Sequence, residues 1–214
     1  MAMDLLILIL GIAGFAFAII VHEVAHGYIA DRLGDPTARL SGRLTLNPIP
    51  HIDLYGSILL PLTLLLFHSP IMFGWAKPVP FDPYNLKNPK KDSALISLAG
   101  PASNLLMALI LAIIYRFVPN QSLSALIGEI MVFNVVLAIF NLIPIHPLDG
   151  GKILVGILPY KESREYDQFM NRFGMIILIF LIFPLFNGAS LISPVIYPVI
   201  NFVINLLIPG FATI

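Results

Sequence analysis

Two histidines and a glutamate near the N-terminus carry the strongest chemical signal in the sequence. The stretch His22-Glu23-Val24-Ala25-His26 places two imidazoles four residues apart within a helical apolar pattern. On an α-helix this spacing puts both rings on one face, where they can share a divalent cation, and Glu23 lies beside them within reach of a water at that cation. The pattern therefore predicts a metal centre with an adjacent general base.

A third ligand is needed, because two imidazoles leave a zinc ion short of the usual set of protein ligands. The chain has no cysteine, so a carboxylate is the expected ligand type. Glu129 and Asp149 are the carboxylates in apolar surroundings, and Glu129 is expected at the membrane interface. Asp149 is the better candidate: Pro144 and Pro147 interrupt the helix before it, and the Gly-Gly pair after it lets the backbone come close to a ligand.

The composition places these residues in a membrane protein. Of the 214 residues, 58% are apolar and 11% are charged, and the mean hydropathy is +0.91, whereas an average soluble domain carries about 25% charged residues. Lys and Arg balance Asp and Glu at 12 each, so there is no overall basic field to attract nucleic acid. We therefore exclude a soluble globular domain and a nucleic-acid-binding protein.

Membrane depth also strengthens the metal hypothesis. Ionisable side chains are costly to bury in a bilayer and are tolerated mainly when they are paired, bind a metal or face water. The plain alternative is that His22 and His26 bond to neighbouring helices and that Glu23 is a protonated core residue. The cost of burying three ionisable groups together favours the metal centre.

Long stretches without charge predict an all-α, polytopic membrane protein. A helix needs about 20 apolar residues to cross about 30 Å of hydrocarbon. Residues 57–67 are too short for this, so we interpret residues 57–71 as a re-entrant hairpin with His68 at its tip. Five full spans remain, or six if residues 57–71 cross: 5–21 (continuing to 31), 93–115, 122–148 and two within 173–214, divided at 183–188.

The distribution of basic residues predicts the orientation. With a hairpin at 57–71, every Lys and Arg except Arg116 falls on one side of the membrane, and such residues concentrate in the cytoplasm. The late parts of the first span and of the 122–148 span then lie near the same cytoplasmic end, as ligands of a single ion must. We predict a multi-pass protein of the plasma membrane with its active site toward the cytoplasm.

Two segments are predicted to be extended. Residues 39–46 alternate polar and apolar side chains at period two, which favours a short β element at the membrane surface. Pro78 and Pro80 exclude a helix over residues 75–81. Both segments are candidates for pairing with an extended substrate, and the equal alternative is that they only close the cytoplasmic mouth of the site.

Three motifs, in order along the chain, resemble one known family. They are His22-Glu23-x-x-His26-Gly27, Ala99-Gly100-Pro101-x-x-Asn104 and Asn141-x-x-Pro144-x-x-Pro147-Leu148-Asp149-Gly150. Together they are similar to the site-2 protease family of intramembrane zinc metalloproteases, over residues 5–160. The resemblance implies one Zn²⁺ per chain, and it implies these roles: metal ligands His22, His26 and Asp149, general base Glu23, and Asn141 near the substrate carbonyl.

The resemblance also implies the organisation of the chain and its partners. Residues 1–214 are expected to form a single membrane-embedded metalloprotease domain, with a catalytic core at 5–160 and additional transmembrane helices at 172–210. The stretches 47–53 and 74–80 resemble compact members that lack PDZ or CBS domains. The expected partners are the lipid bilayer and transmembrane protein substrates, whose peptide bonds would be hydrolysed in or near the membrane.

Some alternatives stay open. His146 stands where the family pattern has proline, and it is a fourth ligand, a partner of a ligand, or unrelated to the metal. Asn104 is either near the site or a packing residue, and His51, in a Pro-rich loop, is expected at the surface. For the whole protein, the alternatives are a membrane transporter of metal ions or protons, or an inactive homologue; a transporter has no need of Glu23, so this residue favours the protease.

Overall fold

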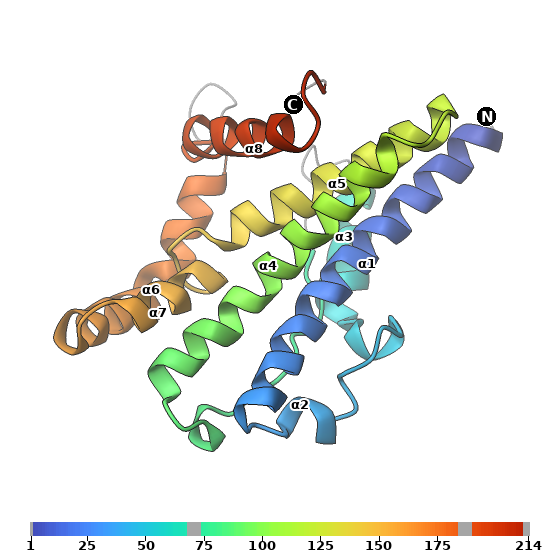
Figure 1. Cartoon of the computed structure of the whole chain (residues 1–214). Coiled ribbons are helices and arrows are strands. Elements are labelled where there is room, and N and C mark those ends of the chain that lie inside the picture. The colour runs from blue at the N-terminus through green and yellow to red at the C-terminus, as the bar shows by residue number, and fades with distance from the viewer. Residues whose placement is uncertain (1, 68–73, 184–189, 212–214) are drawn as a thin grey trace.

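The computed structural model describes residues 2–67, 74–183 and 190–211 of the chain. Three long helices form its centre: α1 (Ala2–Leu33), α4 (Pro89–Tyr115) and α5 (Gln121–Asn141). They lie side by side, and α4 contacts both of the others (Figure 1). Each is long and apolar enough to cross a membrane, with 29 residues in α1 counted from Leu5, 27 in α4 and 21 in α5.

The ends of α4 and α5 follow from local sequence. Pro89 occupies the first turn of α4, where its missing N–H leaves no helical hydrogen bond unmade. Asn120 caps α5, because its side-chain oxygen accepts the N–H of Leu123 at 2.9 Å. Pro144 and Pro147 prevent α5 from continuing, so the chain leaves it as a loop that leads to Asp149.

Shorter helices surround this centre. α6 (Asp149–Ile157) packs on α4, and α7 (Tyr160–Ile182) packs on α6. α8 (Ser193–Leu207) packs on α5, above which it lies in Figure 1, and also contacts α4. The remaining helical pieces are α2 (Thr37–Leu40), η1 (Ile49–His51), η2 (Leu54–Leu59), α3 (Leu60–Leu66) and η3 (Pro83–Asn85).

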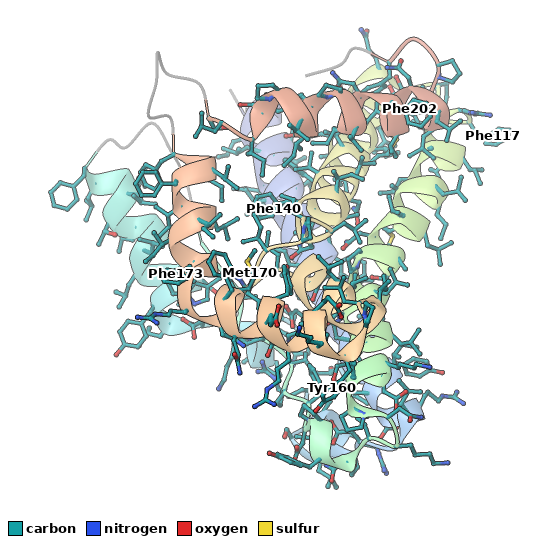
Figure 2. All side chains as sticks on the ribbon, turned by 90° about the vertical axis from the view of Figure 1, so that its left-hand side faces the viewer. Phe117, Phe140, Tyr160, Met170, Phe173 and Phe202 are labelled. Carbon is teal, nitrogen blue, oxygen red and sulfur yellow. The ribbon has the colours of Figure 1, made fainter. Side chains whose placement is uncertain are left out.

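Two of the three apolar clusters among the described residues attach α5 and the loop after it to the C-terminal helices. The larger one joins α4, α5 and α8 through Ala108, Ala112, Met131, Val135, Ile200 and Ile204. The second consists of Ile145, Leu148 and Leu178, with Phe140 of α5 and Met170 of α7 packed against it (Figure 2). Because Ile145 and Leu148 flank the turn before Asp149, the second cluster attaches the Asp149 loop to α7.

The outward faces of the long helices are apolar. Leu5, Leu8, Ile9 and Ile12 of α1 are each more than half exposed. A row of exposed apolar side chains on a helix of this length is expected where the helix faces lipid. The chain is therefore a membrane protein.

The prediction of five to six full spans is not confirmed. Among the described residues, three helices have the length and composition of a span. The helical run Leu54–Leu66 would cover about 20 Å and the 15 residues of α8 about 22 Å, both short of a bilayer. The predicted hairpin tip at His68 and most of the predicted break at 183–188 lie outside the described residues.

The strand predicted at residues 39–46 is wrong. Arg39 and Leu40 belong to α2, and the chain turns after them at Gly42, whose φ of +65° suits glycine. Asp35 favours the short helix α2, because its Oδ1 accepts the N–H of Thr37 at the start of that helix, at 3.1 Å. Residues 2–67, 74–183 and 190–211 contain no strand that could pair with this segment, so local turn bonds outweigh the period-two pattern. Residues 75–81 are not helical, as predicted, and neither are Gly74 and Asp82 beside them.

Candidate metal centre

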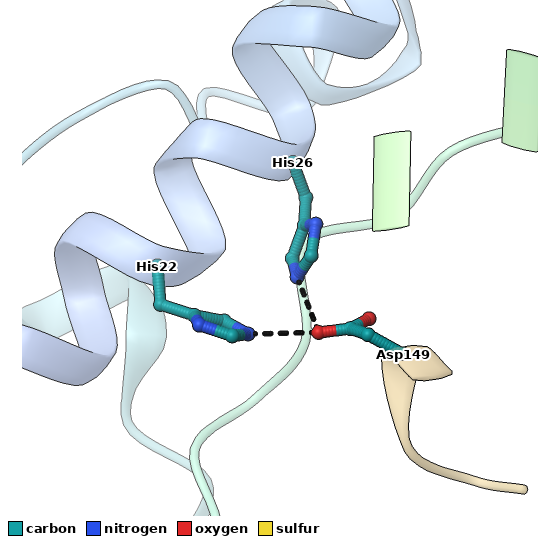
Figure 3. Close-up of side chains that lie close together, drawn as sticks. All are labelled: His22, His26 and Asp149. Atoms are coloured by element: carbon teal, nitrogen blue, oxygen red, sulfur yellow. Dashed lines mark hydrogen bonds and ion pairs between the residues drawn. The ribbon is translucent and has the colours of Figure 1, made fainter. Parts of the chain in front are cut away.

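The structure brings His22, His26 and Asp149 together from α1 and the start of α6. One ligand atom from each lies within 4.8 Å of the others. Nε2 of His22 is 3.1 Å and Nε2 of His26 is 3.2 Å from Oδ2 of Asp149 (Figure 3). Ligands of one tetrahedral zinc at 2.0–2.2 Å lie about 3.3–3.6 Å apart, so Oδ2 of Asp149 already lies at nearly the distance from both nitrogens that a shared ion requires.

The other ring nitrogens are both held by acceptors. Nδ1 of His22 lies 2.6 Å from Oδ1 of Asn104, and Nδ1 of His26 lies 2.7 Å from the carbonyl oxygen of Ile96. An acceptor at Nδ1 requires the proton there, so each Nε2 presents a lone pair to the site. The donor set therefore fits a divalent cation, and both imidazoles are preset for it.

A chain of buried amides fixes the orientation of Asn104. Asn134 of α5 donates its Nδ2 to the carbonyl of Ile130 at 2.9 Å, so its Oδ1 is free to accept. That oxygen accepts Nδ2 of Asn104 at 2.9 Å, which turns Oδ1 of Asn104 toward His22. Asn104 and Asn134 are fully buried, and Asn104 also donates to Ala18 of α1. Asn104 thus belongs to the site and is not only a packing residue.

Gly100 of α4 leaves room for both imidazoles. A Cβ at this position would lie 2.5 Å from Nε2 of His26 and 2.6 Å from Nε2 of His22, distances that atoms in van der Waals contact do not reach. The motif around Gly100 and Asn104 therefore contributes both the space for the rings and the acceptor for one of them.

The carboxylate side of the centre is held by α7. His146 lies in the loop before Asp149, and its Nε2 is 3.0 Å from Oδ1 of Asp167. The hydroxyl of Tyr166 donates to the carbonyl of Pro144 at 2.6 Å. His146 is not part of the ligand group; it connects the Asp149 loop to α7.

A cavity of about 160 Å³ opens at the three ligands. Glu23 lies on its wall, and Oε2 of Glu23 accepts the N–H of Val79 at 2.8 Å. Residues 74–82, which we call the covering segment, thus contact the base predicted from sequence. The lining residues are His22, Glu23, His26, Pro78, Val79, Phe81, Ile96, Ser97, Asn141, Pro147, Asp149 and Lys152.

The covering segment is anchored on both sides of Val79. Arg43 donates to the carbonyls of Lys77 and Pro78, at 2.7 and 3.0 Å. At the other end, the buried carboxylate of Asp35 accepts the N–H of Asp82 at 2.7 Å. Burial alone would raise the pKa of Asp35, but its several hydrogen bonds, first from Thr37, lower that pKa below the ordinary value. The segment is therefore fixed to the loops that follow α1 as well as to the site.

Three other predicted positions have different outcomes. Asn141 lines the cavity, and its Nδ2 donates one hydrogen to the carbonyl of Leu137 at 2.9 Å. Glu129 is exposed and lies against Gly11 of α1, away from the ligand group. The prediction of a surface position for His51 is wrong: it is buried, with Nε2 2.8 Å from the carbonyl of Thr45, because the loops fold back over it.

Sequence reasoning missed Asn134, Val79 and Lys152. Asn134 carried a usable signal, because an amide in the middle of an apolar span is expected to bond to another helix. Val79 contacts Glu23 through its backbone N–H, and Lys152 lines the cavity because of its place on α6, so neither has a signal in the residue type alone.

Comparison with known proteins agrees with this donor set. The family described as Peptidase family M50 matches residues 118–181, which include α5, the Asp149 loop and α6. YwhC of Bacillus subtilis, named "Putative zinc metalloprotease", is 35% identical over 184 residues, which cover 81% of this chain and 80% of that protein. Rip2 of Mycolicibacterium smegmatis, named in the same way, is 29% identical over 187 residues, 85% of this chain and 70% of that protein.

A zinc metalloprotease of Methanocaldococcus jannaschii is 26% identical over 145 residues, which cover 67% of this chain and 33% of that protein. No solved structure gives a significant match.

Proposed function

The chain belongs to peptidase family M50, the site-2 protease family of zinc metalloproteases, and from this premise we propose that it hydrolyses peptide bonds in or near the transmembrane segments of membrane proteins. The observation that carries the proposal is the convergence of His22, His26 and Asp149 at a cavity that Glu23 also lines. The two histidines and Glu23 come from one stretch of the chain and Asp149 comes from another. His22 and Asp149 are 127 positions apart in the sequence.

His22, His26 and Asp149 would hold one Zn²⁺. When bound there, the ion would polarise the scissile carbonyl and make a water molecule more acidic. The protein contributes the orientation of both rings, through the Nδ1 bonds to Asn104 and Ile96. This donor set of two neutral imidazoles and one carboxylate is typical of catalytic zinc, which keeps one position for the reaction.

Glu23 would act as the general base and then as the general acid. Its Oε2 is engaged by Val79, and no donor among the described residues bonds Oε1. Oε1 takes a proton from the attacking water as the water oxygen bonds to the carbonyl carbon. The carboxyl group then gives that proton to the amine nitrogen as the C–N bond breaks.

Asn141 would stabilise the negative charge that develops on the carbonyl oxygen. One amide hydrogen is used on Leu137, and the second N–H remains for an oxygen in the cavity. This role is weaker than that of the ligands, because an amide already bonded to its own helix is restricted in where it can point.

We place the cavity near the cytoplasmic face of the plasma membrane. His22 and His26 lie in the later part of the span Leu5–Leu33, and the basic residues of the chain, apart from Arg116, are expected at that end. The domain would then consist of residues 1–214 with its catalytic core at 5–160. Its substrate would be a transmembrane protein whose helix is unwound close to this cavity.

The test is cleavage of a synthetic transmembrane peptide by the full chain in lipid vesicles, with and without a chelator, with fragments identified by mass spectrometry. Glu23→Gln should lower the rate by about 10²- to 10⁴-fold and leave one zinc per chain, because Glu23 is not a ligand. Glu129→Gln makes the same chemical change away from the site and is the matched control.

Two results would contradict the proposal. Cleavage at the full rate by the Glu23→Gln protein would remove the assigned base. Zinc uptake into vesicles without peptide cleavage would support the transporter instead.

A further inference from the structure

Lys152 lines the cavity beside the metal centre, and the hydrolytic roles proposed above do not use it. It follows Asp149 by three residues on α6, so the two side chains share one face of that helix. The ammonium nitrogen lies 4.9 Å from the ring centroid of Phe81, which belongs to the covering segment and also lines the cavity. Lys152 therefore stands at the rim where α6 meets that segment.

The charge of Lys152 has no carboxylate partner in the part of the chain that the structure describes. Its recorded contact is the face of Phe81, which attracts a cation but does not neutralise it. Asp149, one turn away, directs Oδ2 to the two imidazoles. Other basic side chains nearby are used on the backbone: Lys90 donates to the carbonyl of Leu158, and Arg43 to carbonyls of the covering segment.

The charges of the cavity wall favour an anionic occupant. Two carboxylates, Glu23 and Asp149, line the cavity and would balance one divalent cation. Lys152 is the single Lys or Arg among the lining residues, so it leaves one net positive charge in a small space. Such a charge attracts an anion and makes a matching one bind more strongly than it would in open water. The first turn of α6, at the positive end of its helix dipole, adds to the same field.

We propose that Lys152 is a specificity-determining residue that binds a carboxylate of the substrate peptide beside the scissile bond. The inference rests on the proposed function, because the carboxylate belongs to the peptide that would be hydrolysed in the same cavity. The carboxylate comes from an Asp or Glu side chain near the cleaved bond or from the free C-terminus of the substrate. An ammonium–carboxylate contact serves both sources, so the test separates them.

The experiment compares peptides that differ by one charge. A transmembrane peptide that the protein cleaves is prepared with Glu or Gln at each of the three positions on either side of the cleaved bond, and with a free or amidated C-terminus. The wild-type protein should prefer the carboxylate at one of these places by about 10-fold in kcat/KM. Lys152→Met should abolish the preference, Lys152→Arg should keep most of it, and Lys152→Glu should reverse it toward a peptide with Lys at that place.

The control variant is Lys161→Met, which removes an exposed ammonium of α7 outside the cavity and should leave the preference unchanged. Zinc content is measured in every variant, so that loss of the metal centre is not mistaken for loss of recognition. Binding of the same peptides is measured by fluorescence anisotropy with the Glu23→Gln protein, with and without Lys152→Met. The dissociation constants of the Gln and Glu peptides should differ by the same factor as their kcat/KM values, and this difference should disappear with Lys152→Met.

A wild-type protein that cleaves all the peptides equally, or a Lys152→Met protein that keeps the wild-type preference, would overturn the role of Lys152 and leave the protease assignment intact. Failure of the zinc-loaded wild type to cleave any peptide would count against the protease instead. In that case Glu or Gln is placed at each position along the transmembrane peptide, and the ratios of dissociation constants with and without Lys152→Met decide the role of Lys152.

Discussion

The histidine side of the metal centre is built from three long helices, whereas its carboxylate side is built from a loop, α6 and α7. On the histidine side, the His22 and His26 side chains are 6% and 11% exposed, and the residues behind them, Asn104 and Asn134, are 0% and 1% exposed. On the carboxylate side, the Asp149 side chain is 14% exposed, and the Asp167 side chain that holds its loop is 44% exposed.

This difference in burial predicts how strongly a substitution on each side should lower the affinity for zinc. Buried hydrogen bonds between packed helices have no water to replace a lost partner, so each is costly to break. A partly exposed ion pair contributes little, because water screens it and replaces it. The histidine side should therefore determine the affinity for zinc, and the contacts behind the carboxylate side should adjust it only slightly.

The largest effect is expected from Gly100→Ala, which acts on the histidine side. The added methyl group would lie within 2.6 Å of both Nε2 atoms, so the rings must move from the positions that meet Asp149. Overpacking of this kind costs about 1–3 kcal/mol, and an effect on both ligands should lower zinc affinity by about 100-fold. Affinity is measured by competition with a chromogenic chelator.

The matched control for Gly100→Ala is Gly11→Ala in α1. A Cβ there would meet the Glu129 side chain at 3.6 Å, an ordinary contact, so zinc affinity should not change. Equal loss in the two variants would show that helix packing in general, and not the space for the rings, limits the centre.

A smaller but still large effect is expected from Asn104→Leu. The substitution removes the acceptor of the His22 Nδ1 proton and leaves Oδ1 of Asn134 without its donor. Loss of a group that orients a ligand typically costs about 10- to 100-fold in metal affinity or activity. Cobalt-substituted protein provides a second measurement, because a His22 ring free to change its tautomer should alter the visible absorption of the bound cobalt.

The control for Asn104→Leu is the milder variant Asn104→Asp, in which a carboxylate oxygen can still accept the His22 proton. It should recover part of the affinity that the leucine variant loses. If both variants bind zinc as the wild type does, the amide chain does not orient His22.

The smallest effect is expected from Asp167→Ala on the carboxylate side. It removes the partner of His146 but leaves the Tyr166 bond to Pro144 and the apolar cluster of the loop. Because the pair is partly exposed, zinc affinity should fall only about two- to fivefold. Glu165→Ala, which removes an exposed carboxylate two residues earlier on α7, is the control and should have no effect.

A loss in Asp167→Ala as large as that in Asn104→Leu would contradict the comparison. It would mean that α7 holds Asp149 as firmly as the helix core holds the histidines.

Local rules were enough to predict part of this protein from its sequence. The spacing of His22 and His26 places both rings on one helix face wherever that helix lies, because the geometry belongs to the helix itself. The apolar stretches predicted α1, α4 and α5 as long helices for the same reason, since composition and length decide whether a helix can cross a bilayer. The prolines after Asn141 predicted the loop that precedes Asp149.

Other features depended on which segments meet in space. Asn104 forms hydrogen bonds with His22 and Asn134 only because α4 packs between α1 and α5. Residues 39–46 carry a strand-like alternation, but a strand needs a partner, and local bonds to Asp35 formed α2 instead. Val79 contacts Glu23 through its backbone N–H, a group that every residue except proline has. The residue type at position 79 therefore could not predict this hydrogen bond.

The sequence by itself determined the helices and the chemistry that each could offer, because those follow from contacts between near neighbours in the chain. Only the tertiary structure decided that an amide chain orients His22, that the backbone N–H of Val79 meets Glu23, and that Lys152 lines the same cavity. Those outcomes depend on contacts between residues dozens to more than a hundred positions apart, and it is the packing of whole helices that selects among them.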